Sequence, residues 1–227
     1  MDYVSRFKRA GKNVCVHPDA FIEHPEVVEV GDDVTIEKGV YICGKPKECR
    51  FGSRVRLETS VYMTLDRARL VIGNDVRLYP FCYISGGENF VEIGNHTHFA
   101  PGCVIYGHGG TKVGNHCAFA AHSMLASIAH DWRRVDVPMD ITSVRGPIVI
   151  EDNVYAGANV IINMGITVRR GCCIAANAVV LEDTEPGGLY VGAPAKRKCD
   201  RNDPGKPPPK TFGSLFKKLR RQTRRPA

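Results

Sequence analysis

A six-residue period dominates the sequence from residue 150 to residue 184. Apolar residues, mostly large aliphatic ones, recur at every sixth position, and a small or β-branched residue follows each of them four positions later. The first series is Ile150, Ala156, Ile162, Val168, Ile174 and Val180, and the second is Val154, Val160, Ile166, Cys172, Ala178 and Thr184. This period excludes a β-sandwich, whose strands alternate with a period of two residues.

The same cadence continues upstream, where an aliphatic or aromatic residue is followed by Gly and polar residues. These segments begin at Val30, Phe51, Ile72, Ile93 and Val113, with successive starts 21, 21, 21 and 20 residues apart. We interpret each hexad as a short strand plus a turn and three hexads as one coil, with coils stacked about 4.8 Å apart. The sequence therefore predicts an all-β fold, a left-handed parallel β-helix, which is an exception to the usual right-handed crossover.

The hexads divide the chain into three parts. We expect a lead-in over residues 1–29, the β-helix over residues 30–195 and a basic tail over residues 196–227. An insertion over residues 126–147 interrupts the repeat and contains the one Trp of the chain, next to a His-Asp pair. An irregular insertion of this kind in a regular solenoid is typical of a functional loop.

Charge is distributed unevenly along the chain. Residues 196–227 contain 12 Lys/Arg and 2 Asp/Glu, a balance of +10, so the +7 of the whole chain leaves the body at −3. A mildly acidic body argues against nucleic-acid binding, because such a function needs a basic patch on the folded domain.

Cysteine and histidine patterns favour neither disulfides nor a metal. The nine Cys form no C-x-x-C pair, and an odd number argues against a complete disulfide framework. Four of them, Cys82, Cys103, Cys117 and Cys172, fall on interior positions of the hexads, where we expect them to fill the core. No three His converge as a zinc site of the β-helical carbonic anhydrase kind requires, so we predict no metal.

The start of the chain is charged, and no apolar run approaches the ~18 residues of a membrane span. We therefore expect a cytoplasmic protein.

Three parts of the sequence resemble the hexapeptide-repeat acyltransferases. They are the insertion, the segment Gly146-Pro147-Ile148-Val149-Ile150 that follows it, and the ending Val191-Gly192-Ala193-Pro194-Ala195. The branch of closest resemblance is that of the galactoside and maltose O-acetyltransferases and their relatives in capsule, exopolysaccharide and lipopolysaccharide assembly. The resemblance covers roughly residues 50–196.

The resemblance implies a homotrimer with acetyl-CoA in the groove between neighbouring prisms. It implies that His130 is the general base for a sugar hydroxyl, because an imidazole of pKa near 6.5 can accept that proton. It further implies that the donor is bound by Tyr155, Gly157, Ala158, Ala176 and Lys196.

Three further residues are candidates for substrate binding. Asp131 either orients an imidazole of another copy or caps a turn. Trp132 either lines the acceptor site or packs the loop onto a neighbouring prism, and His108 is an alternative to His130. The acceptor-binding Asn typical of galactoside enzymes is not evident around Pro101.

The tail combines a Pro-rich spacer with an amphipathic segment. Phe212, Leu215, Phe216 and Leu219 lie on one face of an expected short helix that is otherwise basic. Peripheral contact with an anionic membrane or a lipid-linked acceptor, capping of the prism end, and a solvated tail all remain open.

The predicted function is acetyl-CoA-dependent O-acetylation of a sugar hydroxyl, the acceptor being free, lipid-linked or nucleotide-linked. The alternatives are an N-acetyltransferase of a nucleotide-linked amino sugar or of an antibiotic, and a β-helix scaffold without chemistry.

Overall fold

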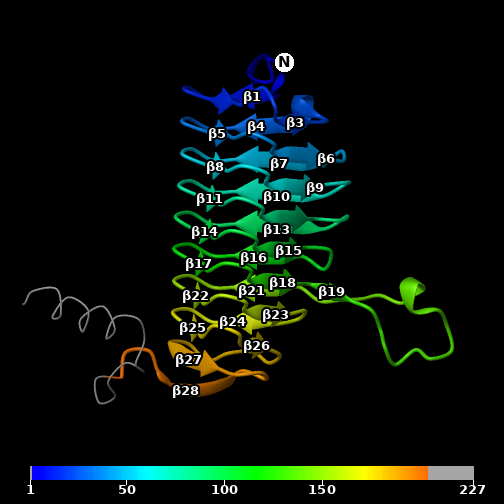
Figure 1. Cartoon of the computed structure of the whole chain (residues 1–227), viewed down its shortest axis with the longest axis vertical. Coiled ribbons are helices and arrows are strands. Elements are labelled where there is room, and N and C mark those ends of the chain that lie inside the picture. The colour runs from blue at the N-terminus through cyan, green and yellow to red at the C-terminus, as the bar shows by residue number, and fades with distance from the viewer. Residues whose placement is uncertain (1, 204–227) are drawn as a thin grey trace, which may run out of the picture.

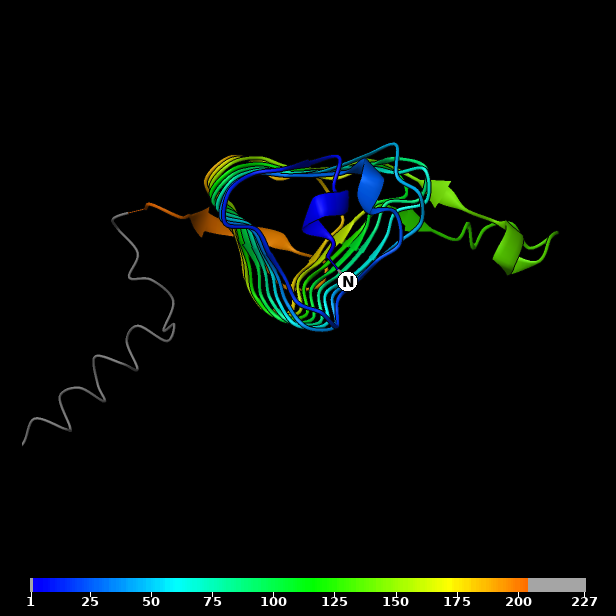
Figure 2. The ribbon, with the colours of Figure 1, turned by 90° about the horizontal axis from the view of Figure 1, so that it is seen from above.

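The chain folds into a triangular prism built of stacked coils, as the computed structural model shows (Figures 1 and 2). The structure describes residues 2–203. Three parallel sheets, here called A, B and C in the order in which each coil visits them, form the three faces of the prism. Apart from strands, the described residues include three short 3-10 turns, η1 (Val4–Arg6), η2 (Pro25–Val27) and η3 (Met139–Ile141).

Each face is a continuous sheet that runs the length of the prism. Sheet A contains β1 (Arg9–Ala10), β4 (Val28–Val30), β7 (Glu48–Phe51), β10 (Arg69–Ile72), β13 (Phe90–Ile93), β16 (Thr111–Val113), β21 (Ile148–Ile150) and β24 (Thr167–Val168). Sheet B contains β2 (Cys15–Val16), β5 (Thr35–Ile36), β8 (Arg56–Leu57), β11 (Arg77–Leu78), β14 (His98–Phe99), β17 (Ala118–Phe119), β22 (Tyr155–Ala156), β25 (Cys173–Ile174), β27 (Gly188–Val191) and β28 (Lys196–Asp200). Sheet C contains β3 (Phe21–Ile22), β6 (Tyr41–Cys43), β9 (Tyr62–Thr64), β12 (Tyr83–Ser85), β15 (Val104–Tyr106), β18 (Met124–Ala126), β23 (Ile161–Asn163) and β26 (Val179–Val180).

The register of the strands confirms the predicted coil. In sheet A, Leu70 lies beside Cys49 and beside Val91, which are 21 residues away on either side. Below the insertion, Ile150 lies beside Val168, 18 residues further on, which is three hexads without an extra residue. The longer coils therefore add their surplus residues at the corners and leave the three faces in register.

The core is the column of side chains inside the prism. All residues of the two hexad series from 150 to 184 are buried, each with at most 6% of its surface exposed. Identical side chains stack from coil to coil, as in Phe99 and Phe119, whose rings are parallel with centroids 4.4 Å apart. The four interior cysteines are buried as expected, and all nine Cys are free thiols.

A ladder of hydrogen-bonded polar side chains joins successive coils at the corner between sheets A and B. The side-chain oxygen of Asn95 accepts the backbone N–H of Asn74 at 2.8 Å, and that of Asn115 accepts the N–H of Asn95 at 2.8 Å. Asp152, on the far side of the insertion, continues the ladder by accepting the N–H of Asn115 at 2.8 Å. The coils thus close on one another across the insertion.

The β-helix begins earlier than the start at residue 30 that we expected. Strand β1 pairs with β4, with Arg9 beside Glu29, so the expected lead-in already contains one coil. Ala10 occupies the position at which later coils have a large aliphatic or aromatic residue. Because this residue is small, the repeat pattern in the sequence does not indicate the first coil. Tyr3 and Phe7 are buried and cover its open end.

The lower end of the prism is closed by a reversal of the chain. Strand β27 continues sheet B in parallel with β25, and β28 then returns antiparallel to β27. The first five residues of the expected tail therefore belong to the sheet. The amphipathic segment proposed for residues 211–225 lies outside the described residues. In the part of the chain that the structure describes, no helix is long and apolar enough to cross a membrane.

The three faces differ in chemistry. Sheets A and B carry charged side chains outward, among them Arg69, which forms ion pairs with Glu48 and Glu92. The strands of sheet C carry no charged residue. Its outer surface is instead a column of apolar side chains, which begins with stacked rings of Phe21, Tyr41, Tyr62 and Tyr83 and continues as Val104, Met124, Ile161 and Val179.

Candidate active site

The insertion forms an arm that projects from the corner between sheets C and A (Figures 1 and 2). Its root is a short antiparallel pair, β19 (Ile128–Ala129) with β20 (Val144–Arg145). Ser127 fastens this root: its hydroxyl donates to Tyr106 O at 2.5 Å and accepts from Gly109 N at 2.8 Å, and its carbonyl accepts from Gly146 N at 3.1 Å. The arm is therefore anchored to the coil above it.

His130 lies where the arm leaves its root, and its side chain is oriented by the returning strand. Its Nδ1 lies 2.6 Å from the backbone carbonyl oxygen of Thr142. A carbonyl oxygen can only accept, so Nδ1 carries the proton in the neutral imidazole. The lone pair is then on Nε2, the nitrogen that a general base needs. His130 is exposed, so that lone pair is accessible.

Thr142 is itself held in place. It is 7% exposed, and its hydroxyl donates to Met139 O at 2.8 Å, across the turn η3. Sequence reasoning missed its role, because a backbone carbonyl can come from any residue type and leaves no signature.

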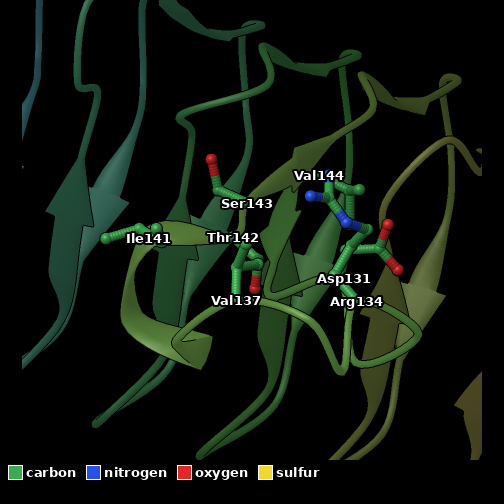
Figure 3. Close-up of a pocket in the computed structure, with 7 residues that line it drawn as sticks. All are labelled: Asp131, Arg134, Val137, Ile141, Thr142, Ser143 and Val144. Carbon is green, nitrogen blue, oxygen red and sulfur yellow. The ribbon is translucent and has the colours of Figure 1, made fainter.

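The Asp131 carboxylate pairs with Arg133, and the Nδ1 atom of His130 pairs with Thr142 O. The carboxylate of Asp131 accepts from Arg133 Nε at 2.9 Å, and this hydrogen bond is the main cause that lowers its pKa. It lines a shallow hollow of about 270 Å³ on the arm, together with Arg134, Val137, Ile141, Thr142, Ser143 and Val144 (Figure 3). The hollow thus adjoins the residue that orients His130.

The arm presents several large apolar side chains to its surroundings. Trp132 is 75% exposed and Val135 is 93% exposed, and Ile141 and Met139 are also exposed. Within this chain Trp132 does not pack onto the prism. Such a cluster is typical of a segment that contacts another molecule.

His108 lies behind the root of the arm. Its Nε2 is 3.1 Å from the buried hydroxyl of Ser85. Burial, assisted by the charge of Arg145, lowers its pKa, so its ring is neutral near pH 7. Its Nδ1 is buried and has no hydrogen-bond partner among the described residues.

The residues expected to bind the donor lie on a different part of the prism. Tyr155 points outward from sheet B and is 42% exposed. Gly157 and Ala158 follow it at the corner between sheets B and C, and Ala176 lies at the same corner one coil below. Asn177 N donates to Ala158 O at 2.9 Å, which joins the two coils there.

Close packing explains the glycine at this corner. A Cβ on Gly157 would lie 2.6 Å from Ala176 N. Ala158 and Ala176 have small side chains, so the backbone at this corner is within reach of an extended ligand. Lys196 lies on β28 at the lower end, where its Nζ pairs with Glu182 at 3.0 Å.

One chain therefore carries the two halves of the predicted site at two different corners. His130, Asp131 and Trp132 are on the arm, at the corner between sheets C and A. Ala158 and Ala176 are at the corner between sheets B and C. The whole of sheet C separates them, so the structure does not bring them together within one chain.

No group of three or more His, Cys, Asp or Glu in residues 2–203 has the geometry to hold a metal ion.

Residues 147–182 match the family model described as the hexapeptide repeat of succinyl-transferase. The matched segment runs from the end of the insertion through β21 to β26. A curated relative, the 2,3,4,5-tetrahydropyridine-2,6-dicarboxylate N-acetyltransferase of Staphylococcus aureus, is 44% identical over 50 residues. That match covers 22% of this chain and 21% of the relative, so the chain spans about a fifth of that relative's length in the match.

Two solved structures are similar to this chain over almost its whole length. One is a point mutant of AntD, an N-acyltransferase from Bacillus cereus, in complex with dTDP-4-amino-4,6-dideoxyglucose and coenzyme A, with TM-score 0.51 and 16% identity over 96% of this chain and 92% of that one. The other is the polysialic acid O-acetyltransferase OatWY, with TM-score 0.51 and 16% identity over 94% of this chain and 97% of that one. These likenesses show the fold, a left-handed parallel β-helix.

Proposed function

We propose that this protein is an acetyl-CoA-dependent acetyltransferase whose general base is His130. The observation that carries the proposal is the hydrogen bond between His130 Nδ1 and Thr142 O, which fixes the tautomer with an accessible lone pair on Nε2. The insertion that presents this imidazole interrupts a hexapeptide repeat, and AntD, which has the same fold, was solved with coenzyme A.

The proposed reaction is direct transfer. His130 Nε2 accepts the proton of the acceptor hydroxyl as its oxygen attacks the thioester carbonyl, and the C–S bond of the tetrahedral intermediate then breaks. The departing thiolate takes up the proton from the imidazolium, so the base is restored. General-base assistance of this kind contributes about 10²- to 10⁴-fold in rate.

We propose a sugar hydroxyl as the acceptor group, in the assembly of a surface polysaccharide. OatWY, one of the two proteins similar in fold, acts on polysialic acid and transfers to oxygen. A hydroxyl is a weak nucleophile and benefits from a base, which is what the orientation of His130 provides.

N-acetylation of an amino sugar is the second candidate. It is favoured by the relative with 44% identity over 50 residues, which is an N-acetyltransferase. A free amine already has its lone pair and depends less on a base, so the two candidates differ in what the loss of His130 would do.

The proposed site forms between copies of the chain. The arm and the donor corner flank sheet C, the face without charged strand residues. If three prisms stand side by side with sheet C facing a common threefold axis, the corner that bears the arm in one copy meets the donor corner of the next. The exposed Trp132 and Val135 then gain a neighbour. We therefore propose a homotrimer with three sites.

The experiment that tests the function measures thiol release from acetyl-CoA with matched alcohol and amine acceptors, methyl glucoside and 2-amino-2-deoxyglucose. We expect saturable binding of CoA by calorimetry and ester formation on the glucoside. Amide formation alone would support the second candidate, and the absence of any CoA binding would contradict both.

A further inference from the structure

An aromatic residue occupies a turn position that favours glycine or asparagine. Residues 79–82 form the turn between sheets B and C, closed by Cys82 N donating to Tyr79 O at 3.3 Å. Pro80 precedes Phe81, whose φ is +64°. A turn with Pro second and a positive φ third is of type II, which favours Gly or Asn at that third position. One coil below, the same turn reads Pro101-Gly102, with φ +71° at the glycine.

Phe81 has no counterpart among the described residues. Thirteen non-glycine residues have positive φ, and the other twelve are Asn, Asp, Ser, Arg or His. At the same corner the positions equivalent to Phe81 hold glycine at 39 and 102, Ser60 one coil above, and His122, Asn159 and Asn177 below. For a bulky residue this backbone region is an outlier that costs conformational free energy.

Burial does not compensate that cost, because Phe81 is 66% exposed. In the described chain none of the ring contacts involves it. A strained aromatic side chain that stabilises neither its turn nor the core points to a role in contact with another molecule.

Its position relates it to the proposed site. Phe81 lies at the same corner as Ala158 and Ala176 but at a different height on the prism. Phe81 is two coils above the coil from which the arm emerges, and Ala158 and Ala176 are one and two coils below that coil. Two coils correspond to about 10 Å, about the length of one to two sugar units. The arm level thus separates Phe81 from the donor residues.

The adjoining surface of sheet B is polar but carries no net charge. The guanidinium of Arg77 stacks on the ring of Tyr79, 4.3 Å from its centroid, and forms an ion pair with Glu58. The imidazole of His98 meets the edge of Tyr79, with centroids 6.4 Å apart. Burial, assisted by the charge of Arg77, lowers the pKa of His98, so it is neutral near pH 7.

We propose that Phe81 is the platform of the acceptor subsite, on which an uncharged sugar ring stacks, with Tyr79 and His98 available to its hydroxyls. The inference rests on the proposed function and deepens it by naming the acceptor surface and an uncharged ring as its occupant. A sugar ring has one apolar C–H face and a polar rim, which fits an exposed phenyl ring beside phenol and imidazole groups. Arg77 pairs with Glu58, and Arg56, which lies beside Arg77 in sheet B, pairs with Glu37. Both cations are therefore already paired, so the surface offers no excess charge to a carboxylate.

The test uses Phe81→Asn in the full-length protein, with Ser60→Asn as a matched control at the same turn position and φ one coil above. The probes are methyl α-glucoside and methyl β-galactoside, whose binding is measured by ligand-observed NMR at saturating CoA. The accompanying measurements are CoA affinity by calorimetry, molar mass by light scattering and the midpoint of thermal unfolding.

We expect Phe81→Asn to weaken binding of at least one glycoside about tenfold. CoA affinity and molar mass should stay unchanged and the unfolding midpoint should stay equal or rise, because Asn tolerates positive φ. Ser60→Asn should change none of these. Unaltered glycoside binding in Phe81→Asn, no binding by the wild type, or a loss of molar mass would overturn the proposal. CoA binding is read separately, so failure of the donor site would be recognised as failure of the proposed function.

Discussion

At the scale of the residue, the backbone carbonyl of Thr142 decides which nitrogen of His130 can act. Without an acceptor at Nδ1 an imidazole samples both tautomers and turns freely, and a fixed tautomer raises the fraction of molecules ready to take a proton. The arm therefore carries both the proposed base and the group that orients it.

Replacement of His130 tests this role. We expect His130→Ala to lower kcat for an alcohol acceptor by at least about 100-fold. The KM for acetyl-CoA should change little, because the residues proposed to bind the donor lie at another corner. Steady-state kinetics measure both constants. Asp131→Asn is the control, since Asp131 pairs with Arg133, and it should retain most of the activity. Wild-type turnover in His130→Ala would refute the assignment.

His108 links stability to pH. Its pKa is lowered in the folded state, so between that value and the unfolded value near 6.5 the unfolded chain binds more protons. The contribution of neutral His108 to the free energy of unfolding is therefore fully present above about pH 6.5. It is lost progressively as the pH falls from there through the lowered pKa of the folded state. We expect the midpoint of urea unfolding to fall less between pH 7 and pH 5 in His108→Gln than in the wild type. An equal fall in both proteins would contradict this account.

At the scale of the element, strands and corners obey different rules. A strand of the prism needs one apolar residue that points inward, and the six-residue period of the sequence shows where each of these residues lies. The sequence alone was therefore sufficient to predict the faces and the core of the prism. The arm's root and the first coil were missed. The root is held by backbone groups and by the hydroxyl of Ser127, and the first coil has Ala10 at the place of a large residue.

Close approach at the corners predicts where glycine is irreplaceable. A Cβ on Gly52 would lie 2.6 Å from Asn74 Oδ1 and 2.7 Å from the backbone carbon of Gly73. We expect Gly52→Ala to destabilise the fold by about 1–3 kcal/mol through overpacking, measured by urea unfolding. Gly165→Asn is the control, because nothing lies within 4 Å of that position and Asn tolerates its φ of +75°. If both variants unfold at the wild-type midpoint, the corners are less tightly packed than described.

At the scale of the whole molecule, the three faces differ in the chemistry of their outer side chains, and this difference supports the proposal that sheet C faces neighbouring copies. Sheets A and B expose ion pairs, which are compatible with water. Sheet C exposes a column in which Phe21 is 41%, Tyr62 40% and Ile161 38% exposed. From the sequence, the resemblance implied the trimer, but the choice of face needed the coordinates, because it depends on which outward positions align in three dimensions.

A charge placed on sheet C tests the assembly. We expect Tyr62→Glu to dissociate the proposed trimer while leaving the β-sheet signal in circular dichroism intact, because an unpaired charge would be buried between copies. Thr35→Glu, outward on sheet B, is the matched control and should leave the molar mass unchanged. A Tyr62→Glu protein that remains trimeric in light scattering would show that sheet C faces solvent.

The most direct test of a site shared between copies is complementation. Chains carrying His130→Ala have an intact donor corner, and chains carrying Ala158→Trp have an intact arm but a blocked corner. Each protein alone should be inactive, and after the two are mixed, unfolded and refolded together, acetyl transfer should reappear, because some sites then combine an intact arm with an intact corner. Assemblies of mixed composition that stay as inactive as their parents would show that arm and corner act within one chain, or not at all.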